Sequence, residues 1–160
     1  MSDLGLMDRE TRATVDDHRA LRLWLRLLTC SQLIEREVRR RLRSRFGTTL
    51  PRFDLLAQLE RHPGGLRMSE LSRLLMVTGG NVTGIVDQLV KEGLVERLDD
   101  ARDRRAWRVK LTRAGERSFG EMAREHERWM VELLGGVTRK ESDALMQLLG
   151  RMKQAVLEKA

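Results

Sequence analysis

Apolar residues recur at helical spacing over most of the first fifty positions, and this run limits the possible folds more than any other feature. Leu21, Trp24 and Leu28 are three or four residues apart, and the pattern continues at intervals of four to Phe46. The sequence therefore predicts one helix over residues 17–46, about 45 Å long. Because this length exceeds the diameter of a small domain, part of its apolar face is expected to pack on a second subunit.

Three shorter helices are predicted after Gly47, which ends the long one. Pro51 suits the first turn of the second helix. Ser69 is a suitable N-cap for the third helix and Thr78 for the fourth, which Gly93 ends. The apolar side chains expected on their inner faces are Phe53, Leu56, Leu59, Leu71, Leu74, Leu75, Val82, Ile85, Val86 and Leu89. The third and fourth helices, joined by a tight turn, predict a helix-turn-helix.

The hydrophobic period changes after Gly93. Segments 94–98 and 106–111 are short and rich in Val and Leu, and the charged stretch 99–105 separates them. This pattern predicts a β-hairpin with a polar tip, which would form a wing beside the helix-turn-helix.

Two further helices are predicted after the hairpin. Thr112 can cap a long helix that reaches Leu134, and Thr138 with Glu141 forms a T-x-x-E capping box for the last one. The predicted fold is mainly α with a small β-hairpin. It is a winged helix-turn-helix lobe at 51–112, with N- and C-terminal dimerisation helices at 17–46 and 113–160 and a flexible N-terminal segment at 1–16.

Composition excludes several classes of protein. No apolar stretch approaches the roughly 20 residues of a membrane span, and the N-terminus lacks the features of a secretory signal. With a single cysteine, Cys30, no internal disulfide can form, and we expect a cytoplasmic protein without membrane contact. Cys30 lies inside the first predicted helix, away from the helix start that would favour a thiolate, so a redox role is not expected.

Catalytic and metal-binding motifs are missing from the sequence. There is no tyrosine, nucleophile elbow, phosphate loop or paired histidine motif. His18, His62 and His126 are far apart and have no ligand spacing. We expect no enzyme activity, no metal and no cofactor.

The charge of the chain points to a polyanionic partner. Lys and Arg number 31 against 24 Asp and Glu, which gives a net charge of +7. The stretch from Arg36 to Arg52 contains many arginines but only one acidic residue, Glu37. This block either touches phosphates or forms a solvated helix face whose arginine stems cover apolar surface.

The N-terminal half of the second helix in a helix-turn-helix enters the major groove of DNA. Asn81 and Thr83 are the expected base readers, because amides pair with adenine and hydroxyl and methyl groups contact several bases. The glycines here lower helix propensity, which a close approach of the backbone to DNA would explain. Alternatively, Gly79 and Gly80 only loosen the first turn and Asn81 is a capping residue. The predicted DNA contacts of this helix are Thr78, Gly79, Gly80, Asn81, Thr83, Gln88 and Lys91.

The predicted wing tip carries Arg102, Arg104 and Arg105. Arginine is favoured in a narrow A·T-rich minor groove, and Arg104 is the residue we expect there. Asp103 is expected to hold Arg105 and stiffen the turn, because phosphates would repel its carboxylate. The alternative is a charged turn that is fully solvated.

The run from Ser69 through Thr112 resembles the MarR family of bacterial regulators. The family pairs a helix-turn-helix with a wing that carries D-x-R and ends in V-x-L-T, matched here by residues 103–105 and 109–112. The resemblance implies a homodimer formed by the first helix and the last two, and a palindromic DNA operator. It also implies a small-molecule pocket between each DNA-binding lobe and the dimerisation helices. Gly84 departs from the pattern, since many members have an arginine there.

Segments 21–35 and 47–61 further resemble a subgroup that responds to aromatic acids or aromatic acyl-CoA thioesters. The resemblance predicts a repressor that such an effector releases from DNA. The expected pocket residues are Trp24, Leu28, Arg52, Phe53, His126 and Trp129, and the arginines of 39–45 suit a coenzyme A phosphate. Alternatively, the aromatic residues serve only in packing, or the protein is an architectural or interaction protein without an effector.

Overall fold

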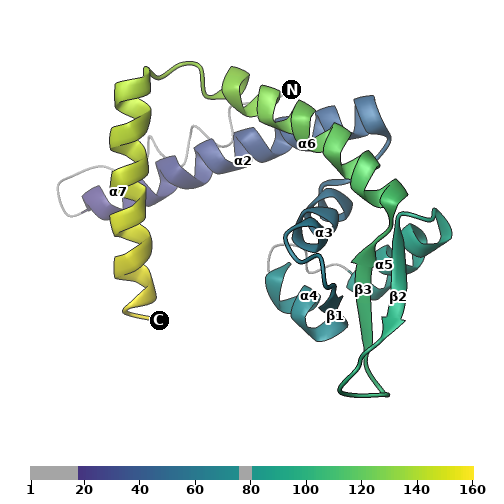
Figure 1. Cartoon of the computed structure of the whole chain (residues 1–160). Coiled ribbons are helices and arrows are strands. Elements are labelled where there is room, and N and C mark those ends of the chain that lie inside the picture. The colour runs from purple at the N-terminus through teal and green to yellow at the C-terminus, as the bar shows by residue number, and fades with distance from the viewer. Residues whose placement is uncertain (1–17, 76–80) are drawn as a thin grey trace. The chain divides into compact units, whose positions relative to one another are not determined.

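The first element is the long helix α2 (Arg19–Phe46) of a computed structural model that describes residues 18–75 and 81–160 (Figure 1). Its predicted end is confirmed: Gly47 has a φ of 61°, and its N–H donates to the carbonyl of Arg43 at 3.0 Å. The predicted flexible segment 1–16 lies outside the described residues. Val38 and Leu42 are buried in this helix, whereas Trp24 is 56% exposed.

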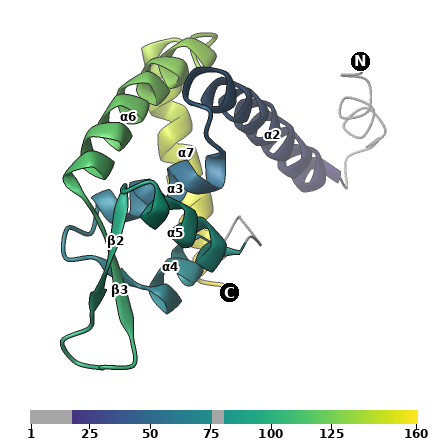
Figure 2. The same cartoon turned by 90° about the vertical axis from the view of Figure 1, so that its right-hand side faces the viewer.

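The lobe after α2 combines short helices with a small sheet. Helices α3 (Leu50–Glu60), α4 (Met68–Leu74) and α5 (Val82–Lys91) precede the hairpin, which extends away from them (Figure 2). Its core is built from leucine, valine and phenylalanine side chains of all these elements. The least exposed members are Leu55, Leu56, Leu59, Leu71, Val86, Leu89 and Val109. This arrangement confirms the predicted winged helix-turn-helix fold.

The sheet is antiparallel and has the order β1-β3-β2. Strands β2 (Val95–Asp99) and β3 (Trp107–Leu111) form the predicted hairpin, within one residue of the expected bounds. The short strand β1 (Leu66–Arg67) was not predicted, and it pairs with Val109 and Arg108 of β3. The wing is thus the outer part of a three-stranded sheet.

Helix α4 corrects two predictions. Ser69 is not its N-cap, because the helix begins at Met68, where the carboxylate of Glu70 accepts the backbone N–H of Arg67 at 2.7 Å. Leu74 does not face inward and is 44% exposed, since the last turn of α4 directs only Leu71 and the following Leu75 into the core. Thr78, the predicted cap of the next helix, lies outside the described residues. The described α5 is capped by Asn81 instead.

Helix α6 (Arg113–Leu133) starts at the predicted cap. The hydroxyl of Thr112 accepts the N–H of Gly115 at 3.0 Å and donates to the carbonyl of Gly93 at 2.6 Å. A Cβ on Gly115 would lie 1.9 Å from the carbonyl oxygen of Leu94, so only glycine fits there. These contacts join the start of α6 to the segment that follows α5.

The chain divides into two parts, one up to Arg124 and the other from Glu125 to Ala160. The second part contains the end of α6 and helix α7 (Arg139–Leu157), whose predicted capping box is present. The backbone N–H of Thr138 donates to Glu141 at 2.7 Å, and these hydrogen bonds lower the pKa of Glu141. Among the described residues, no helix is long and apolar enough to cross a membrane.

Candidate nucleic-acid interface

Helix α5 presents a polar outer face because its inner face is fixed in the core. Val86 and Leu89 are fully buried, whereas Thr83, Gln88 and Lys91 are exposed. These three exposed side chains lie on the helix where DNA contacts are predicted. The predicted contacts Thr78, Gly79 and Gly80 lie outside the described residues.

Asn81 has a capping role at the start of α5. Its Oδ1 accepts the backbone N–H of Gly84 at 2.9 Å. A Cβ on Gly84 would approach the Asn81 Nδ2 atom to 2.7 Å, so the absent side chain leaves room for this cap. The cap offers a reason for Gly84 that needs no DNA contact. The Asn81 amide nitrogen is a donor, and the residue is exposed, so capping and base contact are compatible.

An ion pair links the helix to the wing. The guanidinium of Arg97 on β2 donates to the carboxylate of Asp87 on α5. Both side chains are partly exposed, so the pair contributes little to stability. It does show that this face of the hairpin is the one that carries α5.

Asp100 anchors the base of the wing tip, a role that was not predicted from the sequence. Asp100 is only 4% exposed. Its carboxylate accepts hydrogen bonds from Nε and Nη2 of Arg67 at 2.8 and 2.9 Å. It also accepts Arg108 at 3.3 Å and the backbone N–H groups of Arg102 and Asp103 at 2.8 and 3.2 Å. The only sequence signal was a charged stretch without a pattern, because the partner Arg67 lies 33 positions away.

The hydrogen bonds to Asp100 also fix its charge. The Arg67 guanidinium and the Arg102 backbone N–H hold the pKa of the Asp100 carboxyl well below its usual range. Arg108 additionally donates to the carbonyls of Gly64 and Gly65 at 3.2 and 2.6 Å. One ionised carboxylate therefore ties β1, β3 and the wing turn together.

The wing tip beyond Asp100 exposes the predicted contact residues Arg102, Arg104 and Arg105. Asp103 accepts the backbone N–H of Arg105 at 2.9 Å, so it holds this residue through the main chain. The tip is therefore a cationic turn whose backbone is fixed by two aspartates.

The residues predicted for a ligand pocket have separate environments. Phe53 is buried, and its ring centroid lies 5.5 Å from that of Phe119 on α6. Arg52 is not a free cation, because its Nη1 donates to Glu92 at 2.9 Å. Its Nε atom is buried and has no hydrogen-bond partner in the part of the chain that the structure describes.

The remaining predicted pocket residues lie on α2 and on the second part of the chain. Trp24 is exposed and Leu28 half-buried on α2. His126 and the buried Trp129 meet edge to face with ring centroids 6.5 Å apart, and burial lowers the pKa of His126. The structure thus gives two aromatic pairs and leaves the predicted ligand contacts untested.

Ion pairs within α2 reduce the charge of the arginine-rich block. Arg39 donates to Glu35 at 3.0 and 2.5 Å, while Arg40 and Arg41 share Glu37. These two guanidiniums lower the pKa of Glu37 to about 2. This geometry favours the solvated-face interpretation for the middle of the block.

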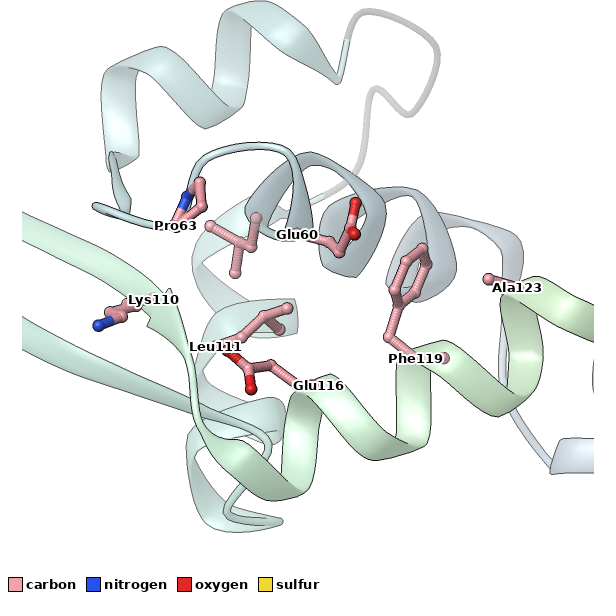
Figure 3. A pocket seen from close by; sticks show the side chains of 9 residues that line it. Glu60, Pro63, Lys110, Leu111, Glu116, Phe119 and Ala123 are labelled. Atoms are coloured by element: carbon pink, nitrogen blue, oxygen red, sulfur yellow. The ribbon is translucent and has the colours of Figure 1, made fainter.

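A hollow of about 310 Å³ lies where α3, β3 and the first half of α6 meet (Figure 3). Its floor is apolar, and the carboxylates of Glu60 and Glu116 lie at its edge. Its lining consists of Leu59, Glu60, Pro63, Lys110, Leu111, Glu116, Phe119, Gly120 and Ala123. None of the predicted ligand contacts is among these residues. The described part of the chain holds no cluster of three potential metal ligands.

Comparison with known proteins gives consistent matches. A model described as MarR family matches residues 46–106. The chain is 34% identical to a MarR family transcriptional regulator from Silicibacter pomeroyi, whose crystal structure superposes with a TM-score of 0.75 over 89% of this chain and 99% of that one. Sco3205 from Streptomyces coelicolor, a MarR family regulator crystallised in complex with DNA, has the same fold at 22% identity, with a TM-score of 0.73 over 89% of each chain.

One curated relative matches over a shorter stretch. The transcriptional activatory protein BadR of Rhodopseudomonas palustris is 32% identical over 98 residues. These residues are 60% of this chain, and the match spans only about half, 55%, of BadR.

Proposed function

Because the chain belongs to the MarR family of transcriptional regulators, we propose that it binds a specific DNA operator through α5 and the wing. The members of this family are regulators and not enzymes. We propose that the protein acts in the cytoplasm, where the DNA lies. The observation that carries the proposal is the exposed face of α5 beside a cationic wing tip, both held by one buried core. Sco3205, with the same fold, was crystallised with DNA.

The two parts of this interface divide the work of recognition. Thr83, Gln88 and Asn81 on α5 face the major groove, where hydroxyl and amide groups read base edges. Arg104 and its neighbours enter the adjacent minor groove, where narrow A·T-rich segments attract arginine. The Asp100 hydrogen bonds keep the wing from rearranging when it meets DNA.

We further propose that the regulator is a homodimer on a palindromic operator. The apolar residues exposed on α7 and on the N-terminal half of α2 support this assignment, because a second copy would cover them. Two recognition helices would then read half-sites about 34 Å apart.

Regulation by an aromatic acid or an aromatic acyl-CoA completes the proposal. The resemblance of segments 21–35 and 47–61 to regulators of that subgroup supports an aromatic effector, and Phe53, His126 and Trp129 are its candidate contacts. The effector would bind more tightly to a dimer whose two recognition helices have a spacing that does not fit DNA. A preference of about 1 to 3 kcal/mol would weaken operator affinity about 5- to 150-fold, so the ligand would release repression. BadR is described as a transcriptional activatory protein. Whether this chain represses or activates transcription therefore needs a measurement of its own.

Fluorescence anisotropy of labelled duplexes tests the DNA-binding proposal. The protein first selects a duplex from a random pool, and its affinity for that duplex is compared with a scrambled one. Asn81→Ala should lower the ratio of the two affinities, whereas Arg104→Ala should weaken both and reduce the salt slope by about 1.

The same titration is repeated with aromatic acids and their coenzyme A thioesters. Release by one of them supports the effector proposal, and transcription from the selected operator in vitro gives the sign. Equal affinity for both duplexes, with no response to any compound, would instead establish the architectural binder.

A further inference from the structure

Trp107 is a large apolar side chain that the protein leaves uncovered. It begins β3, directly after the cationic wing turn, and it is 54% exposed. Covering the exposed part of this side chain with another molecule would be favourable. Its neighbours Arg104 and Arg105 belong to the predicted DNA contacts.

The strand register places Trp107 on a particular face of the wing. Side chains alternate along β3, so Trp107 shares a face with the buried Val109 and Leu111. Arg97, paired opposite Val109, lies on this face as well and reaches Asp87 of α5. Trp107 therefore lies on the face that carries α5, beyond the part that the core covers.

DNA geometry identifies what this face would meet. With α5 in the major groove and the wing tip in the adjacent minor groove, one sugar-phosphate strand separates the two. That strand passes the part of the wing between α5 and the tip, where Trp107 lies. We propose that Trp107 packs on this strand and so holds the wing against DNA, an inference that rests on the proposed function.

The chemistry of the indole fits a sugar-phosphate strand. The ring offers an apolar surface to the C–H groups of deoxyribose, and its Nε1–H is a donor for a phosphate oxygen. Neither contact reads a base. Trp107 thus adds affinity on every sequence and adds no charge, in contrast to the arginines next to it.

The hairpin offers a matched control in Leu98. It is 40% exposed, and it pairs with Arg108 on the opposite face of the same two strands. Trp107→Ala should weaken binding about tenfold on the selected and the scrambled duplex alike, with an unchanged salt slope. Leu98→Ala should leave both affinities within about twofold. Thermal unfolding of both variants checks that the fold is retained.

A second measurement reads the contact directly and leaves the protein whole. The protein is labelled with 5-fluorotryptophan, and the ¹⁹F resonance of Trp107 is assigned as the one lost in Trp107→Phe. We expect this resonance to shift on addition of the selected duplex and to become less accessible to a soluble paramagnetic agent.

The outcomes separate this inference from the proposed function. If the wild type binds no duplex, the proposed function fails. If it binds but Trp107→Ala binds equally well and the resonance is unmoved by DNA, only the Trp107 contact is refuted. Equal losses in Trp107→Ala and Leu98→Ala would also refute it, because they would report general damage to the hairpin.

Discussion

Helices α3 and α7 are both rich in leucine but have opposite surroundings. Helix α3 buries Phe53, Leu55, Leu56 and Leu59, whereas no side chain of α7 is buried in the part of the chain that the structure describes. The exposed apolar residues of α7 include Leu145, Met146, Leu148, Leu149, Met152 and Val156. The interior of the lobe is therefore supplied by its own residues, whereas the apolar residues of α7 are exposed.

Helix α2 shows both situations along one helix. Val38 and Leu42, near its C-terminal end, are buried, whereas Leu21, Leu23 and Trp24 near its start are exposed. A helix pattern thus reports that a face is apolar and does not report which molecule covers it. Four predictions test this division between covered and uncovered regions.

The largest effect is expected inside the lobe. Leu56→Ala removes a side chain that is 1% exposed, and it should lower the free energy of unfolding by about 2–5 kcal/mol in a urea titration. Leu98→Ala, at an exposed position of the same lobe, should change it by less than about 0.5 kcal/mol. Equal effects would mean that Leu56 does not belong to the core in solution.

A charge on α7 tests whether a second copy covers it. Leu148→Glu should weaken dimerisation about 100-fold or more in sedimentation equilibrium, because an unpaired carboxylate would be buried in the interface. Gln154→Glu, on the opposite face of α7, is the control and should leave the dimer intact. A monomeric wild type would contradict the proposal that α7 pairs with another copy.

Asp100 is a buried charged residue, in contrast to the buried leucines of the core. Asp100→Asn should lower the melting temperature by about 5 °C, because two arginines lose their shared carboxylate. The pKa of Asp100 is lowered on folding, so its contribution is present above the unfolded pKa near 4 and is lost as the pH falls through the folded value. The wild type should therefore lose melting temperature below about pH 4 more steeply than the variant. Parallel acid profiles would contradict this.

The smallest effect is expected at the exposed start of α5. Asn81→Ala should cost about 1 kcal/mol through loss of the cap. Gly84→Ala should change stability by less than about 0.5 kcal/mol, since the gain in helix propensity offsets the displaced Asn81 side chain. A large stabilisation by Gly84→Ala would show that the cap contributes little.

Local signals in the sequence predicted most of the fold. Gly47, Thr112 and Thr138 end or begin helices by hydrogen bonds to residues at most a few positions away, and the structure has all three. The hairpin follows from a change in the period of the apolar residues. Such features need no knowledge of distant residues.

Most of the missed features depend on distant partners, whereas the start of α4 and the exposed Leu74 are local misses. Strand β1 has only two residues, too few to show a period, and it exists because β3 lies more than 40 positions ahead to pair with it. Arg67 with Asp100, and Arg52 with Glu92, likewise pair across a long stretch of sequence. The predicted effector contacts would also require distant residues to meet, and they stay predictions.

The contacts of Thr112 and Gly115 fix the first turn of α6 to the segment that follows α5. The Thr112 hydroxyl bridges the carbonyl that follows α5 and the backbone N–H of Gly115, and the Leu94 carbonyl packs directly on Gly115. Because these contacts fix the first turn of α6 to the segment after α5, we expect a tilt of this turn to move α5 with it. In the dimer and with the effector that we propose, such a tilt would change the distance between the two α5 helices.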